Sequence, residues 1–250
     1  TVGSIVGQPG TTNIVKNIVL YSRHAGTSTA ELGKVYLNFT CTAMTSPVLN
    51  TDQVYVSYSI TARTVGYAEG AIWLDTVNGT AGTVSYVNGT ADKPVLTLAD
   101  ALTLATNVGV RRIRIINGSS ITMASTITNY SFVGHNWTLA LGTQALSGCY
   151  FEGATVSGTC TGANQIIFNL CSFAVGGTTI PPSLATACGF SGTITMGTAG
   201  DYFFDACYSQ IAGDVSANSP TIDFAAAGAN NLSVRHYAGG LKLANMGSTD

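Results

Sequence analysis

The segment Cys149-Tyr-Phe-Glu-Gly153 decides the fold, because variants of it return at nearly even intervals through the second half of the chain. Each copy has a small or soft residue, any residue, a Phe and then a Gly-rich tail. The other copies begin at Tyr130, Cys171 and Cys188, and a degenerate copy begins at Cys207. The longest interval separates Cys149 from Cys171, and the shortest separates Cys171 from Cys188. A period of about 20 residues rich in strand-forming residues predicts a solenoid whose coils stack on one another.

The repeated cysteines and phenylalanines are predicted to form a ladder in the interior, because equivalent positions on stacked coils lie about 4.8 Å apart. No cysteine pair has the C-x-x-C spacing of a metal site, and no His accompanies them. This favours buried free thiols; a disulfide between neighbouring coils and a metal site are the alternatives. The predicted ladder comprises Cys149, Cys171, Cys188 and Cys207 with Phe132, Phe151, Phe173 and Phe190.

The composition limits the partners of the chain. Only 9% of its 250 residues are charged, against about 25% in an average soluble domain. The net charge is −2, and no Lys or Arg occurs between Arg114 and Arg235. Nucleic acid and anionic membranes are therefore not expected as partners of the repeat. No apolar stretch approaches the roughly 20 residues of a membrane span, and no phosphate-binding loop or other motif calls for a cofactor.

Residues 1–68 lack the repeat and are predicted to form a small antiparallel β domain for attachment or oligomerisation. Apolar and polar residues alternate in 17–21, 34–41 and 53–60, between turns rich in Gly, Ser, Thr and Pro. The tyrosines of this domain could form the outer face of an interface strand, and ordinary cross-strand pairing is the alternative.

Residues 69–250 are predicted to form the solenoid, with one helix over about 97–107. Leu98, Ala101, Leu102 and Ala105 fall on one face of that helix. Thr97 is its expected N-cap, and a strand is expected to begin shortly after Gly109. Because the first coil exposes an open hydrophobic end, this helix is expected to cover it.

The region from about 70 to 240 resembles the pectin-lyase-like proteins. The resemblance implies an all-β chain that contains a right-handed parallel β-helix, with the helix capping its N-terminal end. The matching positions are Trp73 to Asp75, Pro94, Thr97, Ala99, Ala101, Ala105, Ile113, Ile115 and Asn117-Gly118.

Many proteins of that fold cleave polysaccharides, so the carboxylates need examination. A glycoside hydrolase requires two carboxyl groups about 5 to 9.5 Å apart, and the candidates are Glu152, Asp201 and Asp205. An i, i+4 pair on a strand would lie about 13 Å apart, and Glu152 is expected to face solvent. The coils also lack a Lys or Arg that could act as the base of a lyase. The residues leave enzymatic activity undecided and favour its absence.

A sugar-stacking site is a further candidate. His135 and Trp137 lie within one coil and could contact a glycan. The alternative is a turn histidine beside a packed tryptophan.

A low-charge chain with a small β domain before a capped β-helix resembles virion proteins of tailed bacteriophages. This resemblance implies a structural or adhesion protein of the virion surface, assembled in the host cytoplasm. The N-terminal domain would attach to capsid or tail proteins, and the β-helix would project outward, toward a host surface polysaccharide if it binds one. The alternatives are a tailspike depolymerase and a glycan-binding module. A homotrimer is implied by the resemblance, and copies of the chain could cover the C-terminal end, because residues 244–250 lack a cap-like pattern.

Overall fold

The chain divides into two compact units, Thr1–Gly66 and Tyr67–Asp250. A computed structural model describes residues 67–160, 162, 165–210, 219–224 and 230–247, and the backbone of two strands in the first unit. Those strands, β1 (Glu31–Lys34) and β2 (Ser57–Ser59), pair antiparallel. β2 falls within the strand expected at 53–60, and β1 overlaps the one expected at 34–41 only at Lys34. The strand expected at 17–21 lies outside the described residues.

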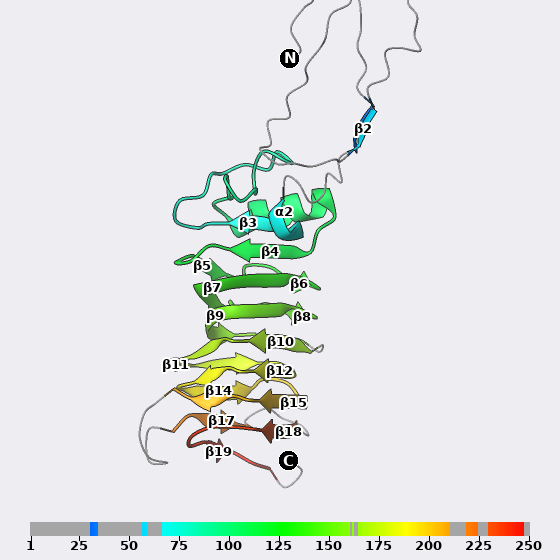
Figure 1. Ribbon diagram of the computed structural model, residues 1–250. Coiled ribbons are helices and arrows are strands. Elements are labelled where there is room, and N and C mark those ends of the chain that lie inside the picture. The colour runs from blue at the N-terminus through cyan, green and yellow to red at the C-terminus, as the bar shows by residue number, and fades with distance from the viewer. Residues whose placement is uncertain are drawn as a thin grey trace, which may run out of the picture. The chain divides into compact units, whose positions relative to one another are not determined.

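The second unit is a parallel β-solenoid of about six coils (Figure 1). Its described strand pairs are all parallel, as the repeat predicted. The elements, in chain order, are η2 (Ala68–Gly70), β3 (Ile72–Leu74), α2 (Leu98–Val108), β4 (Arg112–Ile115), β5 (Ser120–Thr122), β6 (Ile127–Thr128), β7 (Ser131–Ala140), β8 (Leu146–Ser147), β9 (Tyr150–Thr159), β10 (Ile166–Asn169), β11 (Ser172–Ile180), β12 (Ser183–Thr186), β13 (Gly189–Phe190), β14 (Thr193–Met196), β15 (Gly200–Asp205), β16 (Tyr208–Ser209), β17 (Thr221–Asp223), β18 (Asn230–Arg235) and β19 (Lys242–Ala244).

Two faces of the solenoid carry most of these strands. Face 1 stacks β3, β4, the first part of β7, the first part of β9, and then β10, β12, β15 and β18. Face 2 stacks β5, the second part of β7, the second part of β9, and β11. It continues through β13 and β16 at one end of β11, and through β14, β17 and β19 at the other.

The core of face 1 is one column of inward side chains, each in register with the next. All of them are 1% exposed or less, so burial of this column is a main source of stability. Aromatic rings stack in its centre, with ring centroids 5.2 Å and 5.6 Å apart on the two sides of Phe151. The column comprises Ile72, Ile113, Phe132, Phe151, Phe168, Ala185 and Phe204.

The prediction of a single ladder for the repeated residues is wrong in its register. Phe132 and Phe151 lie on face 1, whereas Phe173 and Phe190 lie on face 2, where Phe173 pairs with Val156. The shift occurs between the second and third copies. The motif advances there from position 149 to 171, whereas face 1 takes a shorter step, from Phe151 to Phe168. The third copy of the motif therefore starts further along its coil, and its Phe lies on face 2 instead of face 1.

A left-handed corner joins face 1 to face 2 in successive coils. In each coil the corner residue comes directly after the last paired residue of face 1. Those paired residues are Glu152, Asn169, Thr186, Asp205 and Arg235. Positive φ lets the chain turn there, although a Cβ is disfavoured in this conformation. The corner residues, with φ between 51° and 70°, are Gly153, Leu170, Ala187, Ala206 and His236.

Replacing Ala206 by Gly should stabilise the protein. Ala206 is exposed, with φ 53°, so the substitution removes Cβ strain without removing packing. We expect a gain of about 0.5–1 kcal/mol in the free energy of unfolding, measured by urea denaturation. Ala124→Gly is the matched control, because Ala124 is exposed and has no positive φ; it should bring no gain. A loss of stability in Ala206→Gly would contradict the strain at this corner.

The helix expected at about 97–107 is present as α2, Leu98–Val108. Thr97 Oγ1 accepts a hydrogen bond from the Asp100 backbone N–H at 3.1 Å, and Gly109 ends the helix with φ 72°. The four residues expected on one face all pack against the core, Ala101 and Ala105 fully buried and Leu98 and Leu102 partly buried. Leu104 and Val108 are buried as well. The helix lies beside β3, at one end of the stack (Figure 1).

The other end of the stack exposes positions that are interior elsewhere. Val234 is 36% exposed, although it is in register with Phe204. Leu243 is 46% exposed, although it is in register with the buried Ile222. No further coil follows these strands among the described residues.

Candidate functional site

Glu152 and Asp205 lie in one outward column of face 1 and do not meet. Register pairs lead from Glu152 to Asn169, on to Thr186, and then to Asp205. Three steps of about 4.8 Å put the two residues about 14 Å apart. The carboxyl pair of a glycoside hydrolase is separated by roughly 5 to 9.5 Å. These two carboxylates therefore cannot act on the same glycosidic bond.

Asp201 and Asp205 lie on the outer side of the same strand, β15. Tyr202 and Phe204 alternate with them and are buried. Four residues of extended strand separate the two carboxylates by about 13 Å. The structure thus brings no two of the three predicted acidic residues to hydrolytic spacing.

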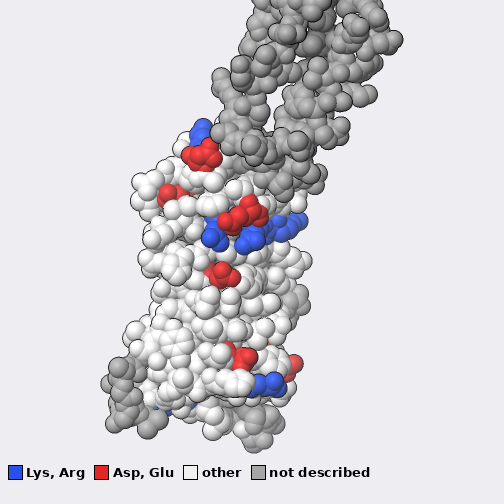
Figure 2. Space-filling view, viewed as in Figure 1, with Lys and Arg blue, Asp and Glu red and all other residues white. Residues whose placement is uncertain are grey.

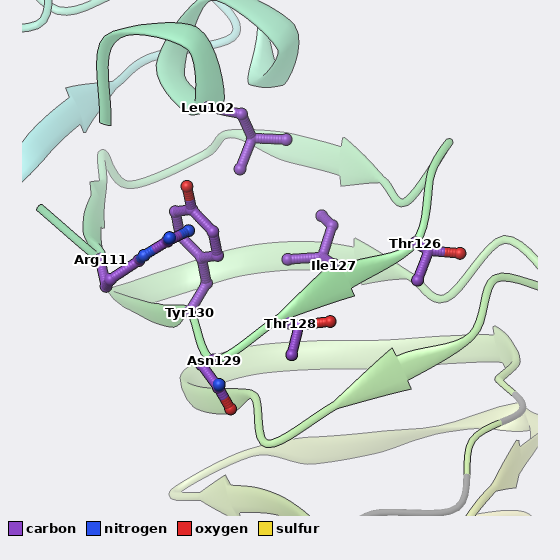
Figure 3. A pocket seen from close by; sticks show the side chains of 7 residues that line it. All are labelled: Leu102, Arg111, Thr126, Ile127, Thr128, Asn129 and Tyr130. Carbon is purple, nitrogen blue, oxygen red and sulfur yellow. The ribbon is translucent and has the colours of Figure 1, made fainter. Parts of the chain in front are cut away.

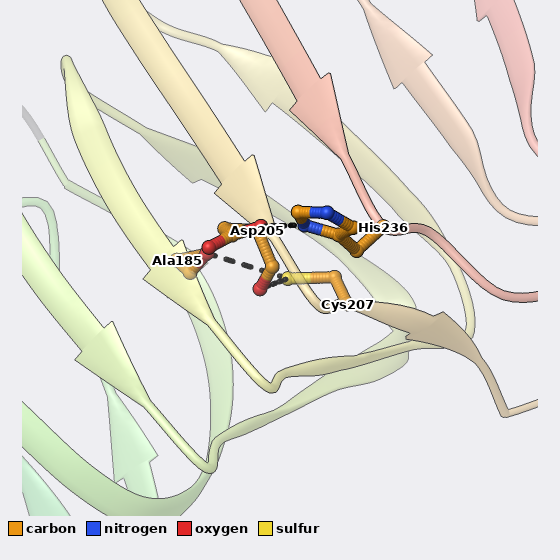
Figure 4. Close-up of polar contacts among 4 residues, drawn as sticks. All are labelled: Ala185, Asp205, Cys207 and His236. Carbon is orange, nitrogen blue, oxygen red and sulfur yellow. Dashed lines mark hydrogen bonds and ion pairs between the residues drawn. The ribbon is translucent and has the colours of Figure 1, made fainter.

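Aspartates of β15 and β17 contact polar side chains of the next coil instead. Asp201 Oδ1 accepts a hydrogen bond from Asn231 Nδ2 at 2.9 Å. Asp223 Oδ1 accepts one from Asn245 Nδ2 at 2.8 Å. Figure 4 shows His236 reaching back to Asp205, with Nδ1 and Oδ1 2.8 Å apart. These contacts tie neighbouring coils together.

Glu152 belongs to a polar cluster on the same face. The Tyr150 hydroxyl donates to Glu152, and Asn169 Nδ2 contacts Glu152 Oε2 at 3.3 Å. Desolvation raises the pKa of Tyr150, and its hydrogen bond to Glu152 raises it further. Tyr150 therefore stays protonated and donates to Glu152, to which Asn169 Nδ2 also donates.

The Asp205–His236 contact gives a pH prediction. The hydrogen bond from His236 is the main cause that lowers the pKa of Asp205. A carboxylate with a lowered pKa adds stability above its unfolded pKa of about 3.9, and this stability is lost as the pH falls through the folded value. In His236→Ala the pKa of Asp205 should rise toward its ordinary value, as measured by carboxyl ¹³C titration. Asn245→Ala, which removes the analogous contact to Asp223, should leave it unchanged. An unaltered Asp205 titration in His236→Ala would refute the link.

His135 and Trp137 do not form the predicted sugar-stacking pair. Trp137 is 2% exposed, and its Nε1–H donates to the Glu152 backbone oxygen at 2.9 Å. Its ring is therefore part of the core. His135 is exposed on the surface.

The described cysteines are all buried and carry free thiols. Cys171, Cys188 and Cys207 follow the left-handed corner in three successive coils, and each Sγ contacts a backbone oxygen of the previous coil at 3.4–3.5 Å. Hydrogen bonds to Cys171 and Cys207, together with burial, raise the pKa of Cys188. Cys149 lies outside this column, because it precedes the face 1 part of β9. Their hydrogen bonds with Cys188 lower the pKa of Cys171 and of Cys207. The ladder therefore has three buried thiols, which pack against the backbone of the previous coil.

The structure forms an arginine–tyrosine pocket that was not predicted from the sequence. It has a volume of about 450 Å³ and lies between α2 and β6 (Figure 3). The Arg111 guanidinium stands 4.8 Å from the centre of the Tyr130 ring, and a second, shallower hollow beside it is lined by Arg112 and Tyr150. The pocket is lined by Leu102, Arg111, Thr126, Ile127, Thr128, Asn129 and Tyr130.

A signal for this pocket exists in the sequence. Three of the arginines fall within Arg111–Arg114, just before a long stretch without cations. Tyr130 follows Arg111 at the same interval at which Cys149 follows Tyr130, which is the length of one coil. On the face shown in Figure 2, charged side chains are few and most of the surface is uncharged.

Among the described residues, no group of three or more His, Cys, Asp or Glu side chains is placed to hold a metal ion. No helix in the described part of the chain is long and apolar enough to cross a membrane. Comparison of the chain with protein-family models, with curated proteins and with solved structures finds no match.

Proposed function

We propose that this chain is a non-catalytic structural or adhesion protein on the surface of a tailed-bacteriophage particle. Unit Thr1–Gly66 would attach to capsid or tail proteins, and the solenoid would project outward as a rod. A right-handed β-helix with α2 as the cap of its first coil fits this proposal, since the buried side of α2 packs beside β3.

One observation carries the proposal: the acidic side chains that a hydrolase would need form contacts between coils and do not come together in one site. Asp201, Asp205 and Asp223 each contact a polar residue of the following coil. The interior beneath them is a continuous apolar column. Such a body resists unfolding and presents a long uncharged surface, which suits a scaffold.

We further propose that the protein assembles as a homotrimer. The exposed Val234 and Leu243 at the end of the stack favour association, because interior positions left open in water are costly. Sedimentation equilibrium of the full chain tests this part, and a monomer at micromolar concentration would refute it.

The placement on the particle is tested by immunogold electron microscopy of intact phage with an antibody against this chain. Label at a regular position on the capsid or tail is expected, and it also fixes the site of attachment. Label found only in the unassembled fraction of the lysate would refute the proposal. The purified chain should release no reducing ends from host surface polysaccharide, and release would establish the depolymerase alternative.

A further inference from the structure

Among the described residues, strand β6 has a neighbouring strand on one side only. That neighbour is β8, and the two form a two-stranded sheet. On the other side, where an earlier coil would supply a strand, the chain forms α2. The arginine–tyrosine pocket fills the space between α2 and β6, with Leu102 pointing from the helix toward the strand (Figure 3).

The backbone of β6 leaves one strand-pairing position open toward this pocket. In parallel pairing, alternate residues turn both their N–H and C=O toward the same neighbour. Asn129 N donates to Ser147 O at 2.9 Å, so Ile127 and Asn129 face β8. The N–H and C=O of Thr128 therefore point the other way, and no hydrogen bond to either is formed among the described residues.

The side chains around this edge favour an anionic ligand. Among the described residues, no carboxylate oxygen lies within 4.0 Å of an Arg111 or Arg112 nitrogen. The Tyr130 ring holds the Arg111 guanidinium over its face, which leaves the N–H edges of the guanidinium available for a bidentate contact with a carboxylate. Leu102 and Ile127 add apolar surface on either side.

We propose that this pocket docks an extended peptide segment of a partner protein. The segment adds as a strand to the free edge of β6 and pairs its backbone with Thr128. It places a Glu or Asp carboxylate on Arg111 and an apolar side chain against Leu102. An extended peptide fits because it supplies a backbone donor and acceptor at strand spacing together with side chains on alternate sides. The proposal does not depend on the phage assignment.

The test uses the full chain and a fluorescent, capped pentapeptide, Ala-Val-Asp-Val-Ala, with a second version in which Asn replaces Asp. Fluorescence anisotropy should show the Asp peptide binding about tenfold more tightly than the Asn peptide, as expected for loss of one charge-assisted contact. Arg111→Ala should weaken the Asp peptide about tenfold and leave the Asn peptide unchanged. Arg235→Ala is the matched control, because Arg235 is an exposed arginine of the last coil, and it should not alter binding.

Hydrogen-exchange mass spectrometry of the same samples tests the strand pairing. Exchange at the Thr128 amide should slow when the Asp peptide binds. Equal affinity for the two peptides would overturn the carboxylate contact, and this comparison needs no variant protein. Protection of Thr128 before any peptide is added would show that the edge is already covered and would overturn the site. Displacement of the peptide by an equal concentration of acetate would reduce the site to a simple anion site.

Discussion

Phe151→Ala should lower the free energy of unfolding of the solenoid by about 3–5 kcal/mol, the range found for loss of a buried phenyl ring. Phe151 is 0% exposed and lies between two stacked rings, those of Phe132 and Phe168. Coils above and below hold these neighbours in place by parallel pairing, so the cavity cannot collapse easily. Urea unfolding followed by far-ultraviolet circular dichroism measures the effect.

Phe203→Ala is the control for this substitution. Phe203 lies on the outer side of β15 and is 39% exposed. Its truncation removes the same atoms and leaves no internal cavity, so the loss should stay below about 1 kcal/mol. Similar losses for the two variants would mean that the phenyl column does not dominate the stability of the solenoid.

The parallel solenoid could be predicted from the sequence because its signal is local and repeated. The regular return of one strand-forming motif specifies coils, and Thr97 and Gly109 specify the ends of one helix. The face that each copy occupies could not be read in the same way. It depends on the length of the chain between copies, and a shortened coil moved Phe173 and Phe190 onto face 2.

The side chains of the candidate site show the same limit. Trp137 is a residue type that often stacks on sugars. The alternation of side chains along β7 points it into the core, where its Nε1–H donates to a backbone oxygen. The three predicted carboxylates lie on outward positions. The rise between coils separates Glu152 from the other two, and four residues of β15 separate Asp201 from Asp205. Arg111 and Tyr130 meet because they are one coil apart. That contact becomes visible only once the coil length is known.

A second large effect is expected at Gly153, where the left-handed corner meets a longer coil. Between matched residues, β7 has Gly134, His135 and Asn136, where β9 has only Gly153. The additional backbone presses on the corner, and a Cβ on Gly153 would lie 2.3 Å from the Gly134 carbonyl oxygen. In the coils that follow, Ala187 and Ala206 carry a Cβ at the equivalent position. The obstacle at Gly153 is therefore the neighbouring backbone more than the left-handed conformation.

Gly153→Ala should consequently cost more than left-handed strain alone. That strain is about 1–2 kcal/mol, and displacement of the Gly134 backbone should bring the total loss to at least about 3 kcal/mol. Gly118→Ala isolates the first contribution, because Gly118 has φ 81° and no heavy atom within 4 Å of the added Cβ. Urea denaturation of both variants should therefore give a clearly larger loss for Gly153→Ala. Equal losses would show that the β7 backbone moves away from the added Cβ without lowering the free energy of unfolding. The additional residues of β7 would then not constrain the corner.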